Sequence, residues 1–177
     1  MKSATKNLEN DHISILKLIS VMDHITTTND PDIDHLEEIV SIIKNFADGV
    51  HHAKEEEMLF PLLEQKGFSR TSGPVAVMLN EHETGRNYVK GMRINIDVYK
   101  NGDKEALKHI YLNMKNYSEL LKSHIAKENN ILFMMADKVL SEKDHGDLLL
   151  SFAAASQNYQ NSSFENRIAE LADFYNI

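Results

Sequence analysis

The sequence of 177 residues has no cysteine, only seven glycines and three prolines, and no long run of apolar side chains. Without cysteine the chain cannot form disulfides, iron–sulfur clusters or thiolate zinc sites. No segment approaches the roughly 18 apolar residues of a membrane span, and the first residues lack the apolar stretch of a signal peptide. We therefore expect a cytoplasmic protein that does not bind membranes.

The chain has fewer basic than acidic residues, which gives a formal net charge of −8. Its lysines and arginines form no cluster along the sequence. Nucleic-acid binding normally requires a basic face, so this class of function is disfavoured. The apolar content of 42% and the charged content of 26% are typical of a soluble globular protein. At this length we expect one domain with a sizeable core.

Apolar side chains recur at intervals of three and four residues through four long segments, the spacing typical of helices that bury one face. A turn around Asp30 and Pro31 separates the first two segments, and Asn101-Gly102 separates the last two. Asp30 and Asp103 are expected to cap the helices that follow them. The expected helices cover about residues 5–27, 31–65, 75–99 and 107–135.

Two shorter helices are expected after these four. Ser141 and Asp144 resemble a capping box and open a helix through about Tyr159, and a last helix follows from about Ser163 to Phe174. No strand pattern competes. We therefore predict an all-α fold, in which residues 1–140 form an up-down-up-down four-helix bundle. Residues 141–177 would form a C-terminal helical extension packed on it.

Two segments of the chain repeat one another, and the repeated residues are of types that bind metals. HHAKEEEMLF (51–60) and HIAKENNILF (124–133) share the pattern H-x-A-K-E-x-x-x-L-F. A His and a Glu four residues apart lie on one side of a helix. One further His, preceded by an acidic residue, lies 39 residues before the first repeat and another 42 before the second. The repeat thus collects four imidazoles and two carboxylates: His12, His51, Glu55, His82, His124 and Glu128.

These side chains lie on the apolar stripes of all four predicted helices, where an unpaired carboxylate would cost several kcal/mol. Two divalent cations would neutralise the carboxylates and accept the imidazole lone pairs. Nitrogen and oxygen donors without sulfur favour iron, manganese or zinc over calcium. If both Glu bridge, the protein fills about eight of the roughly twelve positions around two octahedral ions, which leaves room for an oxide or hydroxide bridge and a small ligand.

The blocks HHAKEE-x-x-LFP, NEHETGR and Y-x-x-LL-x-x-HIAKE-x-x-x-LF, together with His12, resemble the hemerythrin-like (HHE cation-binding) domain, a non-haem di-iron four-helix bundle. The resemblance covers roughly residues 7–138. It implies two iron ions bridged by an oxide or hydroxide, with zinc or manganese as alternatives, and with Glu55 and Glu128 as bridging ligands. The four other implied ligands are His12, His51, His82 and His124.

The chain departs from oxygen-carrying hemerythrins at two positions. Those proteins have a second His one turn after the third-helix ligand, where this chain has Arg86, and an Asp five residues after the last His, where this chain has Glu128 at four. The resemblance therefore leaves the metal ligands one imidazole short. Water or one of three side chains is expected to fill the gap: Glu56, Glu83 or Tyr117. Arg86 would either face the site and steady a bound anion or form a surface salt bridge.

Three other patterns compete with this assignment. His52 and Glu56 form the same His-x-x-x-Glu pair shifted by one residue, but the repeat and the apolar stripe favour His51 and Glu55. The sequence from His82 approaches the zinc-protease motif HExxH but lacks its second His. Glu-x-x-His steps of the ferritin type occur at His12 and at residue 145, without matching inward carboxylates.

The leading functional hypothesis is a di-iron protein that binds or senses O2 or NO, or responds to iron or oxidants. The first alternative is a di-iron enzyme that reduces peroxide or nitric oxide, or supplies iron for repair. The second is a storage or structural site for zinc or iron. The expected partner is a diatomic molecule or peroxide, without nucleic acid or membrane. We expect no separate output domain within the sequence, and a protein partner or a second copy of the chain is compatible with it.

Overall fold

The computed structural model describes residues 3–157 and 161–177, and within these ranges the chain is helical with no strand. The predicted all-α fold is therefore confirmed. In the same ranges, no helix combines the length and the apolarity needed to cross a membrane.

The first and third long helices are uninterrupted α-helices, α1 (Ala4–Ile25) and α4 (Gly73–Lys100). The second and fourth contain π-helical segments, labelled η. The second long helix consists of α2 (Ile33–Ile42), η1 (Ile43–His52), η2 (Glu55–Leu59) and α3 (Phe60–Gln65). The fourth consists of α5 (Ala106–Lys127), η3 (Glu128–Leu132) and α6 (Phe133–Val139).

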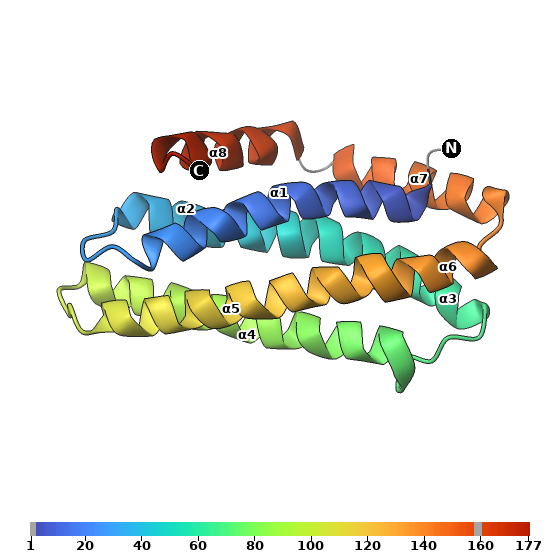
Figure 1. Ribbon diagram of the computed structural model, residues 1–177, viewed down its shortest axis with the longest axis horizontal. Helices are drawn as coiled ribbons and strands as arrows, with labels where there is room; N and C mark the ends of the chain where they lie inside the picture. Colours follow the sequence, from blue (N-terminus) through green and yellow to red (C-terminus); the bar gives the residue numbers. More distant parts are fainter. Residues whose placement is uncertain (1–2, 158–160) are drawn as a thin grey trace.

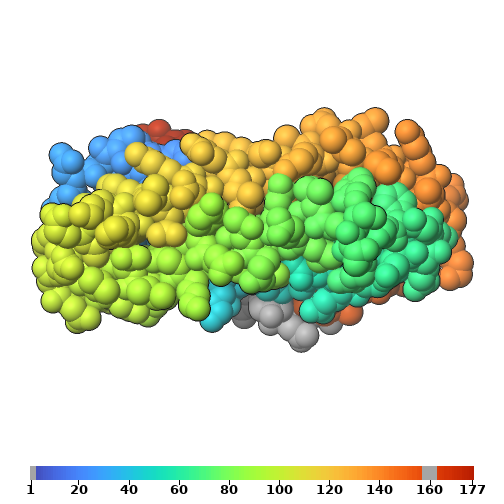
Figure 2. Space-filling model, turned by 90° about the horizontal axis from the view of Figure 1, so that it is seen from below, coloured from blue at the N-terminus to red at the C-terminus, as the bar shows by residue number. Residues whose placement is uncertain are grey.

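The four long helices form an elongated bundle in which each lies against two others (Figure 1). Helix α1 packs on α5, α5 on α4, and α4 on α2, so the chain visits the corners of the bundle in order. Viewed from below, α4 and α5 cover most of one long face (Figure 2). Short turns join consecutive antiparallel helices, as in other up-and-down bundles.

Two further helices, α7 (Glu142–Gln157) and α8 (Asn161–Phe174), lie along the outside of α1 (Figure 1). Helix α7 contacts α1 and η2, whereas α8 contacts α1 and α2. The predicted end of the first of these helices, Tyr159, lies outside the described residues. The division of the chain at residue 140 remains a prediction.

Two helix starts differ from the sequence prediction, in the first case because another residue provides the cap. Helix α2 begins at Ile33 and not at Pro31, since the carboxylate of Asp32 accepts hydrogen bonds from the backbone N–H groups of residues 34 and 35. Helix α5 begins at Ala106, three residues after the predicted cap at Asp103. The predicted capping box is present: Asp144 Oδ2 accepts from the Ser141 N–H at 2.8 Å, and Ser141 Oγ accepts from the Asp144 N–H at 3.2 Å.

The apolar core is divided into two clusters, one in each half of the bundle. One cluster contains Leu8, Leu59 and Phe133, and the other contains Ile15 and Leu121. Each of the four long helices contributes apolar residues to both clusters and buried polar residues to the region between them. The two clusters thus enclose a buried polar layer across the middle of the bundle. They keep water from reaching this layer along the bundle axis.

Candidate metal centre

Seven side chains from the four long helices meet in this polar layer, and none is more than 4% exposed. All six residues that the sequence nominates as metal ligands are among them, and the seventh is His52. The layer consists of His12 from α1, His51, His52 and Glu55 from the second helix, His82 from α4, and His124 and Glu128 from the fourth.

The layer divides into two groups, in each of which one ligand atom per residue lies within 4.8 Å of the others. The first group consists of His52, Glu55, His82 and His124, and the second of His12, His51, Glu55 and Glu128. Glu55 belongs to both groups. Two overlapping sets of nitrogen and oxygen donors are what a dinuclear site requires.

Each carboxylate directs one oxygen atom towards each group. Glu55 Oε1 lies 3.7 Å from His51 Nε2, and its Oε2 lies 3.4 Å from His82 Nε2. Glu128 Oε2 lies 3.2 Å from His12 Nε2, and its Oε1 lies 3.2 Å from His124 Nε2. Among the described residues, none of these four oxygen atoms accepts a hydrogen bond of good geometry, although all are buried. Buried carboxylates left in this state are strongly destabilising unless a cation neutralises them.

All five imidazoles are held by the nitrogen that points away from the layer. Each Nδ1 lies 2.6 to 3.3 Å from a side-chain oxygen atom. The pairs are His12–Asn129, His51–Asp11, His52–Asp48, His82–Glu56 and His124–Glu81. Because amide and carboxylate oxygens only accept hydrogen bonds, each neutral imidazole is protonated at Nδ1 and presents a free lone pair at Nε2.

The Nε2 atoms converge on one another, which tests whether metal ions fit. His12 Nε2 and His51 Nε2 are 3.0 Å apart, and His82 Nε2 and His124 Nε2 are 3.1 Å apart. Where both rings are neutral and carry their protons on Nδ1, two lone pairs face each other. This contact is repulsive in a chain without cations and favourable with a divalent cation between the groups. The donor set therefore fits metal ions.

The charges in the layer lead to the same conclusion. Burial lowers the pKa of His51 to about 4 and that of His52 to about 3, so both are neutral at physiological pH. Burial and the neighbouring Glu128 carboxylate raise the pKa of Glu55 well above its usual range. Burial opposes charge on His124, but Glu128 and Glu81 outweigh it and raise its pKa to about 9. In the absence of metal ions, the negative charge of the carboxylates in the layer must be balanced by bound protons.

The sequence repeat also encodes a second set of contacts around the layer. Lys54, from the first H-x-A-K-E segment, donates to Asp11 Oδ2 at 2.8 Å, and Asp11 contacts His51 Nδ1. Lys127, the matching residue of the second segment, forms an ion pair with Glu81. In each half of the site, the Lys of the repeat contacts the acidic residue that precedes the upstream His, and this carboxylate contacts the imidazole of the repeat. The result is one lysine–carboxylate–imidazole chain in each half. The two chains orient His51 and His124.

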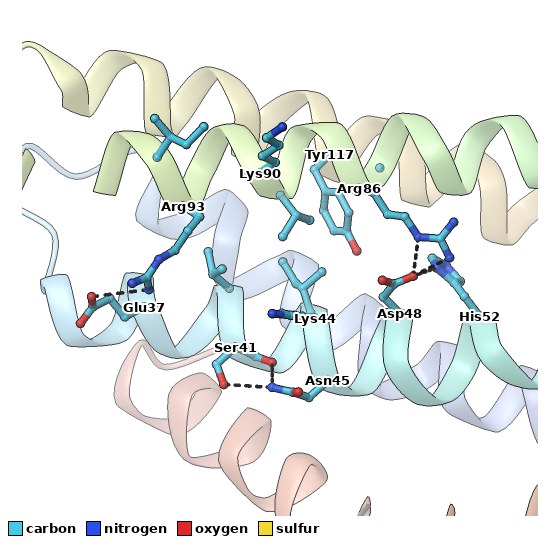
Figure 3. Close-up of a pocket in the computed structure, with 15 residues that line it drawn as sticks. Glu37, Ser41, Lys44, Asn45, Asp48, His52, Arg86, Lys90, Arg93 and Tyr117 are labelled. Carbon is cyan, nitrogen blue, oxygen red and sulfur yellow. Dashed lines mark hydrogen bonds and ion pairs between the residues drawn. The ribbon is translucent and has the colours of Figure 1, made fainter. Parts of the chain in front are cut away.

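The remaining candidates do not supply direct ligands of the layer. Glu56 accepts a hydrogen bond from His82 Nδ1 at 2.6 Å. Arg86 donates to Asp48 at 2.9 Å and to Glu56 at 2.7 Å, and so holds the carboxylates that orient His52 and His82. Contrary to the expectation that it could be a ligand, Glu83 does not reach the layer. Its side chain is 68% exposed and approaches only Arg86, because residue 83 lies on the outer side of α4. Tyr117 lines a cavity beside His52 (Figure 3).

The sequence treats His51 and His52 as alternatives, but the structure places both in the layer. The prediction assumed an α-helical period, in which neighbouring residues point about 100° apart. Residues 43–52 are π-helical, and such segments change the helical phase and occur often at functional sites. His52 also stacks on His82, with ring centroids 3.8 Å apart. The signal in the sequence is the doublet itself, since His51 and His52 each have a Glu four residues on.

We expect His52→Ala to weaken binding of one of the two metal ions by about 100-fold or more, because it removes an imidazole from only the first group. Titration of the metal-free chain with Fe²⁺ or Zn²⁺ would then show one tight and one weak site. His109→Ala is the matched control, because His109 belongs to neither group. Two tight sites in His52→Ala would exclude His52 as a ligand.

Comparisons with known proteins agree with this geometry. The model of the hemerythrin HHE cation-binding domain matches residues 3–136. The chain is 33% identical over 88 residues to the iron-sulfur cluster repair protein YtfE of Edwardsiella ictaluri, covering 49% of this chain and 40% of that protein. The YtfE protein of Escherichia coli O157:H7 is 31% identical over a segment of the same length and coverage.

A longer match is more distant. The protein Rv1995 of Mycobacterium tuberculosis is 24% identical over 139 residues, which is 78% of this chain and 54% of that protein. The chain thus spans about two fifths to about half of the length of the curated relatives it matches.

Proposed function

This chain belongs to the hemerythrin HHE cation-binding family, and we propose that it holds two iron ions in the polar layer and binds a small molecule there. The observation that carries the proposal is the pair of overlapping donor groups joined by Glu55. When bound, the iron pair would supply Lewis-acid and redox chemistry towards O2, NO or peroxide.

The two donor groups are unequal, which favours one side for the external ligand. Three imidazoles, those of His52, His82 and His124, serve the first group, whereas only His12 and His51 serve the second. Each group has four donor residues, but Glu128 Oε1 also lies 3.2 Å from His124 Nε2, so five side chains serve the first group and four the second. We therefore expect a small ligand on the second side. His12 stacks against Phe133 with a centroid separation of 5.7 Å, so an apolar wall borders this side.

The surrounding residues favour a controlled reaction with small molecules. The five imidazoles are fixed through Nδ1, so their orientation need not change when a ligand binds. Apolar clusters on both sides limit access for water and large molecules. These features are those of a centre that admits diatomic molecules or peroxide and excludes bulky substrates.

One measurement tests the proposal: metal analysis of the protein from iron-rich cells, with anaerobic spectra before and after addition of O2, NO and peroxide. We expect about two irons per chain and a spectrum that changes with at least one of these molecules. A spectrum that recovers when the gas is removed indicates a carrier or sensor, whereas consumption of the oxidant indicates an enzyme. One zinc per chain and no iron would refute the iron proposal and favour a structural site.

A second function is favoured by the similarity to proteins named for iron–sulfur cluster repair. In this role the protein would release iron to a damaged cluster on another protein. The test is to mix the ferrous, iron-loaded chain anaerobically with a hydratase whose [4Fe–4S] cluster has lost one iron, in the presence of excess thiol reductant to supply the one electron that rebuilding needs, and to follow its reactivation. Reactivation no faster than with an equal amount of free Fe²⁺ would exclude this function while leaving the iron-binding proposal intact.

A further inference from the structure

A cavity of about 820 Å³ opens between the second long helix and α4, beside the metal centre (Figure 3). Its walls include apolar side chains from both helices, among them Val40, Ile43 and Val89. His52 and the Asp48–Arg86 pair lie at one end of it. The volume is within the range of about 300–1,000 Å³ found for pockets that bind small organic molecules, and it exceeds what a diatomic molecule needs.

The cavity carries a positive charge on a chain whose net charge is −8. Four basic side chains against two acidic ones leave a formal charge of +2 in its wall. Both acidic residues are already paired with the arginines: Asp48 with Arg86 at 2.8 Å, and Glu37 with Arg93 at 3.7 Å. The unbalanced charge is that of Lys44 and Lys90, which form no ion pair within residues 3–157 and 161–177.

Tyr117 provides a second and independent feature. Its side chain enters from α5, and the hydroxyl group points into the space between α4 and the second helix (Figure 3). The residue is 3% exposed, yet the hydroxyl makes no hydrogen bond to any described residue. Since the ring is buried and the hydroxyl borders the cavity, a molecule bound there can form this hydrogen bond. Burial and the nearby Asp48 carboxylate raise the pKa of Tyr117 far above its usual range, so the hydroxyl keeps its proton and is a hydrogen-bond donor.

We propose that this cavity binds a small organic carboxylate with an apolar body. The carboxylate would form ion pairs with Lys44 and Lys90 and accept a hydrogen bond from Tyr117. The apolar body would lie against Val40 and Val89. A neutral molecule would leave the lysine charge uncompensated, and a cationic one would be repelled. The cavity borders the metal centre through His52, but the proposed contacts with Lys44, Lys90 and Tyr117 involve no residue of the two donor groups.

Calorimetric titration of the full, metal-loaded chain with hexanoate tests this proposal, with hexanamide and inorganic phosphate as comparison probes. We expect hexanoate to bind at least about tenfold more tightly than either. The double variant Lys44→Gln/Lys90→Gln should weaken hexanoate binding about tenfold, because two exposed charges are lost. Tyr117→Phe, which removes only the hydroxyl group, should weaken it about fivefold.

Lys138→Gln is the matched control, since Lys138 is an exposed lysine of α6 that does not line the cavity. It should bind hexanoate as the unmodified chain does. Metal content is measured in every variant, so that damage to the metal centre is separated from loss of the carboxylate. Equal affinity for hexanamide, equal affinity for phosphate, or unchanged binding in the double lysine variant would each overturn the proposal. Absence of hexanoate binding would do the same.

Discussion

Glu55→Ala should remove both metal ions, lowering the metal content of the purified protein about tenfold or more. Glu55 belongs to both donor groups, and its two oxygen atoms face His51 in one and His82 in the other. Loss of its carboxylate therefore weakens both sites together, unlike loss of His52. The measurement is metal analysis by mass spectrometry, combined with circular dichroism to show that the variant remains helical.

Glu83→Ala is the matched control for this variant. Glu83 is also an acidic residue of the bundle, but its side chain is 68% exposed and faces away from the layer. It should retain the metal content of the unmodified protein. Full metal content in Glu55→Ala would show that the two ions do not share this residue, and the dinuclear assignment would have to be abandoned.

Removal of the metal should lower the melting temperature by about 8–16 °C. A ligand present at about 1,000 times its dissociation constant stabilises the folded state by about 4 kcal/mol, and about 1 kcal/mol shifts the melting temperature of a chain of this size by about 2–4 °C. The loss has a specific origin. Without cations the Glu55 and Glu128 oxygens have no hydrogen-bond partner among the described residues, and the Nε2 lone pairs of His12 and His51 face one another.

The measurement is calorimetry before and after dialysis against a strong chelator, with metal restored in a third sample. Glu55→Ala serves as the internal control, because a chain that binds no metal should melt at the same temperature with and without chelator. An unchanged melting temperature after complete demetallation of the unmodified protein would place the bound metal at the periphery of the bundle.

The role of the lysines in the repeat could be recognised only from the structure. Lys54 and Lys127 occupy matching positions after His51 and His124, and each holds a carboxylate against the imidazole of its own repeat. Lys54 is only 2% exposed, which is rare for lysine and is tolerated here because Asp11 neutralises it. The repeat thus contains two imidazole ligands, His51 and His124, together with the lysines that help to orient them.

The helical fold and six of the seven residues in the polar layer could be predicted from the amino-acid sequence alone. Both depend on local rules: apolar side chains at helical spacing must share one face, and a His and a Glu four residues apart must share one side. The repeat also matches His51 with His124 and Glu55 with Glu128, and this match requires no information about how the helices pack.

The side chain that completes the layer and the contacts around the layer depend on how the helices pack. The π-helical segment at residues 43–52 changes the helical phase, so His52 lies in the layer beside His51. Arg86 reaches carboxylates 30 and 38 residues away in the chain, and Tyr117 reaches a cavity between two other helices. Such contacts depend on how far each helix is rotated and shifted against its neighbours. Spacing along one helix does not fix these quantities.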